Sequence, residues 1–282
     1  MASSAPDDLL AFLRDADRDR YLACLLTPEE KRRDLVALYA FNAEIARIRD
    51  VVREPLPGEI RLQWWRDVLS GSRDGSATGA PIAAALLATM DRHDLPPGVF
   101  EAYLDARVFD LYDDPMPDRA TFEGYGGETA SALIQLSIMV LDPSAAPHSA
   151  DLAGHAGIAQ LVAGCLLMLP VHCARGQVYV PGDILAAAGL DRDGFLAARD
   201  PDAVSRALQA FIAFGRDHLD KARAALSSAP SSVRGALLTA SLAQPVFDRA
   251  EKRGAACLRE SVQLAQWRRQ WRLFRAAYTG SI

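Results

Sequence analysis

The side chains in this sequence that could hold a metal or an anion gather in a few short segments. The segment 105–114 carries four aspartates, and carboxylates are the ligands that hard cations prefer. Because these aspartates straddle the expected end of a helix, a solvated turn is the simpler interpretation. His172 stands next to Cys173, but no second such pair follows at zinc-finger spacing. We therefore expect no metal at either place.

A second segment is distinguished by what it lacks. Residues 152–182 contain no Asp or Glu, although they include Arg175. A guanidinium in such a segment could bind an anion, or it could pair with Asp50 or another carboxylate on a neighbouring helix. The sequence leaves both interpretations open.

The elements that position these residues are predicted to be helices almost throughout. Apolar side chains recur at spacings of three and four residues, and prolines and glycines separate the segments. Thr27 before Pro28 and Glu30 is typical of a capped helix start. Only residues 177–180 have strand character, and Pro181 ends them. The predicted helices cover residues 27–52, 60–69, 81 onward, 97–111, 127–140, 152–169, 203–226, 233–242 and 258–278.

No internal repeat or long linker divides the chain, so we predict one all-α domain over residues 1–282. The sequence has 31 Lys and Arg against 36 Asp and Glu, a net charge of −5, which argues against electrostatically driven binding of nucleic acid. Four scattered cysteines favour reduced thiols. Residues 1–20 are acidic and resemble neither a secretory signal nor a transit peptide. These features predict a cytoplasmic protein.

The basic and aromatic stretch 267–278 has two interpretations. It is either a solvated helix face or an amphipathic segment that contacts anionic lipid or an acidic partner. The second interpretation would place the protein peripherally at the inner face of the cytoplasmic membrane.

Five segments together resemble a known family. Their order in the chain is residues 35–41 (LVALYAF), 61–67 (RLQWWRD), 103–115 (YLDARVFDLYDDP), 157–161 (GIAQL) and 174–181 (ARGQVYVP). The combination resembles squalene/phytoene synthases, the head-to-head prenyl transferases, over about residues 20–275. This resemblance implies the all-α isoprenoid-synthase fold around one deep apolar cavity. It also implies candidates for the cavity lining: Tyr39, Phe41 and Gln160.

The chemistry of this family needs Mg²⁺ held between two Asp-rich helices, where paired aspartates stand four residues apart. At the first motif Asp50 is present, but Ala46 stands at the other position of the pair. At the second motif residues 152–182 offer no acid. We therefore expect no cofactor, and Mg²⁺ only if the chain is an active synthase. No catalytic residue is assigned, and the residual candidates are Asp50, Arg175 and Tyr179.

Two expectations concern packing around these positions. The aromatic side chains at helical spacing also fit plain core packing, and we expect Trp64, Trp65 or both to be buried. Arg47 stands three residues from Glu44 and from Asp50, so we expect it to pair with them in place of a metal.

A narrower resemblance fits these departures. The stretch AFNAEIARIRD and the Pro-x-His at Pro170–His172 are similar to a degenerate branch of the family. That branch contains the mitochondrial complex I assembly factor of squalene/phytoene synthase ancestry and its bacterial relatives. It implies a bacterial pseudoenzyme that assists assembly of a respiratory complex through a protein partner, such as a subunit of that complex. An active prenyl transferase of terpenoid biosynthesis and a prenyl-lipid binding protein are the alternatives.

Overall fold

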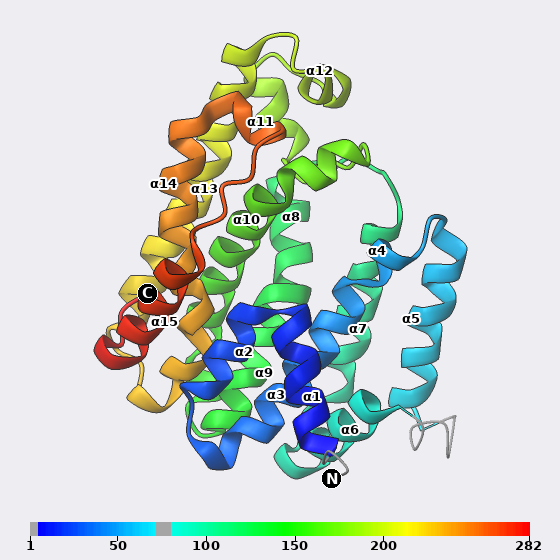
Figure 1. Cartoon of the computed structure of the whole chain (residues 1–282), viewed down its shortest axis with the longest axis vertical. Coiled ribbons are helices and arrows are strands. Elements are labelled where there is room, and N and C mark those ends of the chain that lie inside the picture. The colour runs from blue at the N-terminus through cyan, green and yellow to red at the C-terminus, as the bar shows by residue number, and fades with distance from the viewer. Residues whose placement is uncertain (1–4, 72–79) are drawn as a thin grey trace.

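The computed structural model describes residues 5–71 and 80–282, and these residues form helices without a strand (Figure 1). The predicted all-α class is therefore confirmed. The α-helices are α1 (Ala5–Ala16), α2 (Arg18–Leu25), α3 (Glu29–Ala46), α4 (Ile48–Val51), α5 (Pro55–Leu69), α6 (Pro81–His93), α7 (Pro97–Arg107), α8 (Arg119–Gly126), α9 (Ala132–Leu141), α10 (Ala150–Ala174), α11 (Gly182–Ala187), α12 (Arg192–Ala197), α13 (Pro201–Leu226), α14 (Ala243–Arg253) and α15 (Gln266–Thr279). The 3₁₀ helices are η2 (Val108–Leu111), η4 (Ala146–His148), η5 (Ser231–Leu242) and η6 (Gly254–Leu258), and η3 (Gly127–Ser131) is a π-helical turn.

Helix α10 lies at the centre of the molecule (Figure 1). It packs along α13 and also contacts α9, α14 and η3. By length and composition α10 could cross a membrane, but 61% of its most apolar window is buried within this fold. The burial identifies α10 as the core helix of the bundle, and its apolar character serves packing.

One face of α10 meets the π-helical turn at very short range. A Cβ at Gly157 would lie 2.5 Å from the backbone N and Cα of Ser131, and one at Gly126 would lie 2.3 Å from Ile158 Cδ1. Glycines at these positions allow η3 to approach α10 closely. The turn thereby brings its own backbone to the wall of the cavity described below.

Aromatic side chains fill the core between α3, α5 and α7. The Phe41 ring lies 5.0 Å from Trp65, 5.7 Å from Phe100 and 5.3 Å from Tyr103, between ring centroids. Trp65 is only 2% exposed, and Trp64 packs against it at 5.2 Å. The expectation that at least one of the two tryptophans is buried is confirmed.

The helix predicted over residues 27–52 is divided in the structure. Helix α3 ends at Ala46, and the short α4 follows after Arg47. The predicted cap at Thr27 is wrong, because Pro28 is the N-cap residue and the Thr27 hydroxyl donates to the Cys24 carbonyl at 2.7 Å. Pro55 begins α5, where a missing N–H costs nothing, so this helix starts before the predicted residue 60.

The C-terminal prediction also needs correction. Helix α14 was not expected, and it ends at Arg253, before Gly254, whose φ of +51° is readily adopted by glycine. The helix predicted over residues 258–278 begins only at Gln266. Val262 and Leu264 are buried while their neighbours are exposed, which is the alternation of an extended segment.

The strand-like residues 177–180 form neither a helix nor a strand. Val178 O accepts a hydrogen bond from Met116 N at 3.2 Å, and Met116 O accepts one from Gly182 N at 2.9 Å. Val178 and Val180 are both buried, which explains the strand-like composition of this segment.

Candidate functional site

A cavity of about 460 Å³ opens between α10 and helices from both halves of the chain. One wall comes from α2, α3 and α4, with Arg20, Asn42 and Ala46 among its residues. Others come from α7, η2 and α8, from the π-helical turn, and from η5 and α14. The cavity therefore stands where helices distant in the sequence converge.

The C-terminal end of α10 positions two of the predicted residues. Gly176 has φ +77°, and the following Gln177 N–H donates to the His172 carbonyl at 2.9 Å. This is the glycine-terminated cap that commonly ends a helix. It directs the chain so that Arg175 and Tyr179, on either side of the turn, both line the cavity.

Four residues form a hydrogen-bonded inner network, which we define as Arg107, Asp110, Tyr125 and Tyr179. Asp110 Oδ1 accepts from both tyrosine hydroxyls at 2.8 Å, and Asp110 Oδ2 accepts from Arg107 Nη1 at 2.9 Å. Arg107 Nη1 also donates to Tyr125 at 3.0 Å. Arg107 ends α7 and Asp110 stands in η2, so a spacing of three residues places them together.

Burial strengthens this network. It raises the pKa of Tyr125 and of Tyr179 well above the ordinary value, so both phenols remain protonated donors. Burial disfavours the charge of Arg107, but the oxygens of Tyr103, Tyr125 and Asp110 outweigh it and raise the pKa of this guanidinium. The side chains of Arg107 and Asp110 are 15% and 13% exposed.

The interpretation of segment 105–114 as a solvated turn is wrong for Asp110 and holds for its exposed neighbours. Asp105 pairs with Arg66 at 2.6 Å, and Asp113 pairs with Arg49 at 3.2 Å. Among the described residues, no group of three or more His, Cys, Asp or Glu could hold a metal ion.

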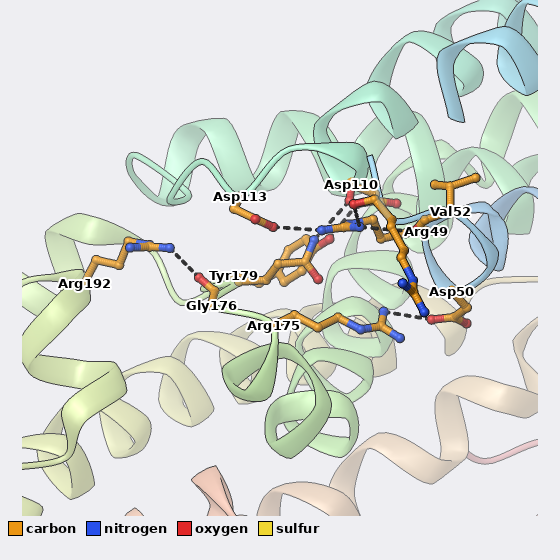
Figure 2. A network of polar contacts seen from close by, with 11 residues as sticks. Arg49, Asp50, Val52, Asp110, Asp113, Arg175, Gly176, Tyr179 and Arg192 are labelled. Carbon is orange, nitrogen blue, oxygen red and sulfur yellow. Dashed lines mark hydrogen bonds and ion pairs between the residues drawn. The ribbon is translucent and has the colours of Figure 1, made fainter. Parts of the chain in front are cut away.

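A second ion pair stands at the edge of the cavity, and we call Asp50 and Arg175 the rim pair. Arg175 Nη1 donates to Asp50 Oδ1 at 2.8 Å, and Figure 2 shows the two side chains pointing toward one another from α4 and the end of α10. Of the two interpretations left open for Arg175, the ion pair is confirmed. The expected pairing of Arg47 is wrong: in the described structure no ion pair joins Arg47 to an acid, and Arg47 is exposed.

The acids of the cavity share one property. Within the described residues, each carboxylate that lines the cavity is paired with an arginine. The pairs are Asp17–Arg20 at 2.5 Å, Asp19–Arg269 at 2.5 Å, Asp50–Arg175 at 2.8 Å and Asp110–Arg107 at 2.9 Å. The cavity therefore neutralises its own negative charge with guanidinium groups.

The donor set does not fit Mg²⁺, which prefers several carboxylate oxygens. Asp50 is already paired, and Ala46 lines the cavity where a second acid of the motif would stand. Opposite them α10 presents Leu167, Met168 and His172. Burial lowers the pKa of His172 to about 4, so its imidazole is neutral, and its Nδ1 is buried without a hydrogen-bond partner.

The predicted lining residues divide into two groups. Gln160 lines the cavity, where its Oε1 accepts from the Thr239 hydroxyl at 3.1 Å. Tyr39 and Phe41 belong instead to the hydrophobic core and do not line the cavity, because the face of α3 that carries them packs inward. Burial raises the pKa of Tyr39 to about 12.

Sequence reasoning missed Arg107 and Tyr125, which are central to the inner network. Arg107 lies inside the segment 103–115 that carried the resemblance, so its position three residues before Asp110 was an available signal. Tyr125 had no local signal, since it precedes a π-helical turn that periodicity does not predict.

Known proteins are similar to this chain in sequence and in fold. Residues 13–275 match the sequence profile of the squalene/phytoene synthase family. The chain belongs to this family. Among its relatives, complex I assembly factor 6 of Rattus norvegicus is 31% identical over 229 residues, which are 81% of this chain and 68% of that protein. The Homo sapiens protein of the same name is 30% identical over 78% of this chain and 66% of its own length.

A bifunctional protein and two solved structures are also similar to this chain. The bifunctional protein CrtB/UppS of Streptomyces coelicolor is 31% identical over 69% of this chain and 34% of its own length. A dehydrosqualene synthase in complex with a ligand superposes with a TM-score of 0.79 at 15% identity, covering 98% of this chain and 96% of that one. The squalene synthase HpnC from Alicyclobacillus acidocaldarius gives 0.73 at 19% identity, covering 89% and 94%. The predicted isoprenoid-synthase fold is confirmed.

Proposed function

We propose that this chain assists the assembly of a respiratory complex of the complex I type through contacts with a protein partner, such as a subunit of that complex, and that it does not transfer prenyl groups. Similarity to mammalian proteins named complex I assembly factor 6, over about four fifths of this chain, supports the assembly role. The proposed location is the cytoplasm, at the inner face of the cytoplasmic membrane.

The proposal that this chain does not transfer prenyl groups rests on the pairing of the cavity's acids with arginines. Ionisation of a prenyl diphosphate requires cations to stabilise the departing pyrophosphate. In this chain Asp50 pairs with Arg175, Ala46 replaces an acid, and α10 presents apolar side chains. The residues that would hold Mg²⁺ in a synthase thus serve packing and ion pairing.

Deletion of this chain from its host tests the assembly role. We expect less intact NADH dehydrogenase on native gels, with full recovery from the parent gene. The Asp50→Asn variant should restore the complex equally, because the proposed role needs no metal-binding carboxylate there. A deletion strain with normal complex that has lost an isoprenoid product would replace this proposal with the prenyl transferase function.

We propose binding of a prenyl lipid as a second function, favoured by one observation. The cavity keeps about 460 Å³, and Leu161, Leu167 and Met168 of α10 contribute an apolar wall. Such a volume lies in the range of small-molecule sites. Mass spectrometry of lipids extracted from the purified protein tests this function. A co-purifying isoprenoid that Leu161→Trp excludes would support it, and an extract without isoprenoid would contradict it.

A further inference from the structure

The last helix of the chain carries a row of aromatic side chains that the fold leaves in solvent. Trp267, Trp271, Phe274 and Tyr278 are 64%, 62%, 53% and 86% exposed. They recur every three or four residues along α15, so they form one line on the helix. Large apolar side chains that are exposed in such a contiguous row mark an interaction surface.

The opposite side of α15 holds the helix to the protein. Leu273 and Ala276 are buried against Ala23, Leu238 and Leu242, which belong to α2 and η5. Because successive residues turn by about 100° in an α-helix, the aromatic row points almost directly away from these buried residues. Figure 1 shows α15 on the outside of the bundle, and it packs on η5 and α2. The fold therefore fixes the row outward.

Arginines give this surface a single sign of charge. Residues 261–282 contain four arginines and no Asp or Glu, although the whole chain carries −5. Arg269 forms an ion pair with Asp19, in which Nε and Nη2 lie 2.9 and 2.5 Å from the two carboxylate oxygens. Arg268, Arg272 and Arg275 are exposed, and in the described structure none pairs with an acid.

A groove beside the row combines both chemistries. It has a volume of about 250 Å³ between α14 and α15, with Pro245, Leu264, Trp267 and Trp271 as its apolar walls. The guanidinium groups at its edge come from Arg249, Arg268 and Arg272. Its one acid, Asp248, pairs with Arg216 at 3.0 Å. The apolar walls fit the hydrocarbon chain of a lipid, and the cationic edge fits its anionic headgroup.

We infer that α15 is a membrane-docking helix that lies in the surface of an anionic phospholipid bilayer, with its aromatic row inserted and Arg272 and Arg275 at the headgroups. Trp and Tyr favour the bilayer interface, and a basic flank adds attraction to anionic lipid. A single row on a 14-residue helix, about 21 Å long, offers less than the roughly 800 Å² per partner of a stable protein interface. Opposite charge and a straight, outward row favour the bilayer.

The ion pair of Arg269 connects this surface to the cavity. Asp19 lines the cavity from α2, and its carboxylate is the partner that anchors α15. Because the aromatic row points away from α2, a docked α15 lies between the membrane surface and the wall of the cavity formed by α2. This placement does not depend on the assembly role, because it follows from the aromatic row of α15 and from the ion pair between Arg269 and Asp19.

Sedimentation with vesicles tests the inference. The full chain is mixed with vesicles of phosphatidylcholine and phosphatidylglycerol, or with vesicles of phosphatidylcholine alone. We expect the parent to sediment with the mixed vesicles far more than with the neutral ones, and added salt should weaken the binding. Its tryptophan emission should shift to the blue, since Trp267 and Trp271 leave water.

Two pairs of substitutions separate the contributions. Trp267→Ala with Trp271→Ala should abolish both the sedimentation and the emission shift. Arg272→Gln with Arg275→Gln should weaken binding about 25-fold, from roughly fivefold for each basic side chain near an anionic surface. The matched control is Arg199→Gln with Arg206→Gln, which removes the same charge from exposed positions away from α15. It should bind within about twofold of the parent, since a local surface depends little on distant charge.

Four results would overturn the inference. The parent could remain in the supernatant with anionic vesicles, or it could bind neutral vesicles equally well. The control pair could lose as much binding as the α15 arginines, which would indicate a net-charge effect. A parent that forms a dimer in light scattering, is monomeric only after Trp267→Ala and Trp271→Ala, and ignores vesicles would assign the row to a second copy of this chain.

Discussion

Two arginine–aspartate pairs in the cavity have almost the same length and very different surroundings. Arg107–Asp110 measures 2.9 Å, and its side chains are 15% and 13% exposed. Arg175–Asp50 measures 2.8 Å, and its side chains are 33% and 44% exposed. The first pair is held by two tyrosine hydroxyls, whereas the second meets solvent. We therefore expect burial and hydrogen bonding, and not the distance between the charged atoms, to determine how much each pair contributes to folding stability.

This difference separates two roles within one site. The inner network is a buried structural element that fixes α7, α8 and the segment after α10 relative to one another. The rim pair lies where the family motif would hold Mg²⁺, and we expect it to add little stability because water screens it. The more buried pair thus lies in the inner network, and the more exposed pair lies at the rim, where the family motif would place a metal-binding acid.

The largest effect on the free energy of unfolding is expected from a substitution that breaks the inner network. Arg107→Met leaves Asp110 buried without its charge partner, which should lower the free energy of unfolding by about 3–5 kcal/mol. Arg175→Met is the matched control at the rim and should cost within about 1 kcal/mol. Urea denaturation of the two variants measures both values. Equal losses would show that burial does not distinguish the pairs.

The next effect concerns pH. Burial lowers the folded-state pKa of His172 to about 4 from an ordinary 6.5, so the unfolded chain takes up its proton first. Folding stability from this residue is complete above pH 6.5 and should fall by about 2–3 kcal/mol as the pH drops from 6.5 to 4. His172→Leu should remove that part of the slope. Chemical denaturation across this range measures the difference between parent and variant, and identical slopes would contradict the prediction.

A smaller effect on the free energy of unfolding is expected from the loss of one hydroxyl of the inner network. Tyr179→Phe removes one hydroxyl from Asp110 and keeps the ring that packs 5.8 Å from Phe109. We expect a loss of about 1–2 kcal/mol, because one hydrogen bond to a charged group is lost without a cavity. Tyr112→Phe, at an exposed tyrosine, is the control and should change little. A Tyr179 variant as stable as this control would place the phenol outside the network.

The smallest effect belongs to the rim. Asp50→Asn removes a half-exposed carboxylate, and we expect the free energy of unfolding to change by less than about 1 kcal/mol. Thermal melts with and without MgCl₂ should be the same for parent and variant. A parent whose melting temperature rises with Mg²⁺, while the variant's does not, would show that Asp50 still binds the ion.

The sequence predicted features that depend on local contacts better than features that depend on contacts between distant residues. The helices and the family followed from local periodicity and motifs, and the rim pair was one of two stated interpretations of Arg175. Asp110 was misjudged because its partners Tyr125 and Tyr179 lie 15 and 69 residues away, and only the folded chain brings them together. The predicted pairing of Arg47 with Asp50 was wrong. Spacing within one helix suggested it, but Arg175 reaches Asp50 from another helix and pairs with it instead.

Helix ends show the same limit. Periodicity predicted a helix through residues 258–265, but Val262 and Leu264 are buried in an extended segment. Tyr39 and Phe41 were assigned to the cavity because core and cavity wall share one composition. Only the packing of α3 distinguishes the face that meets Trp65 from the face that carries Asn42 to the cavity.

The central claim is that the acids of this cavity pair with arginines and support no magnesium-dependent ionisation. Release of pyrophosphate from farnesyl diphosphate, followed with MgCl₂ and again with excess chelator, tests it most directly. We predict no release above the blank without protein under either condition, because Ala46 carries no carboxylate and the residues of α10 that line the cavity include no Asp or Glu. Release that proceeds with Mg²⁺ and stops with chelator would contradict the claim and identify the chain as an active synthase.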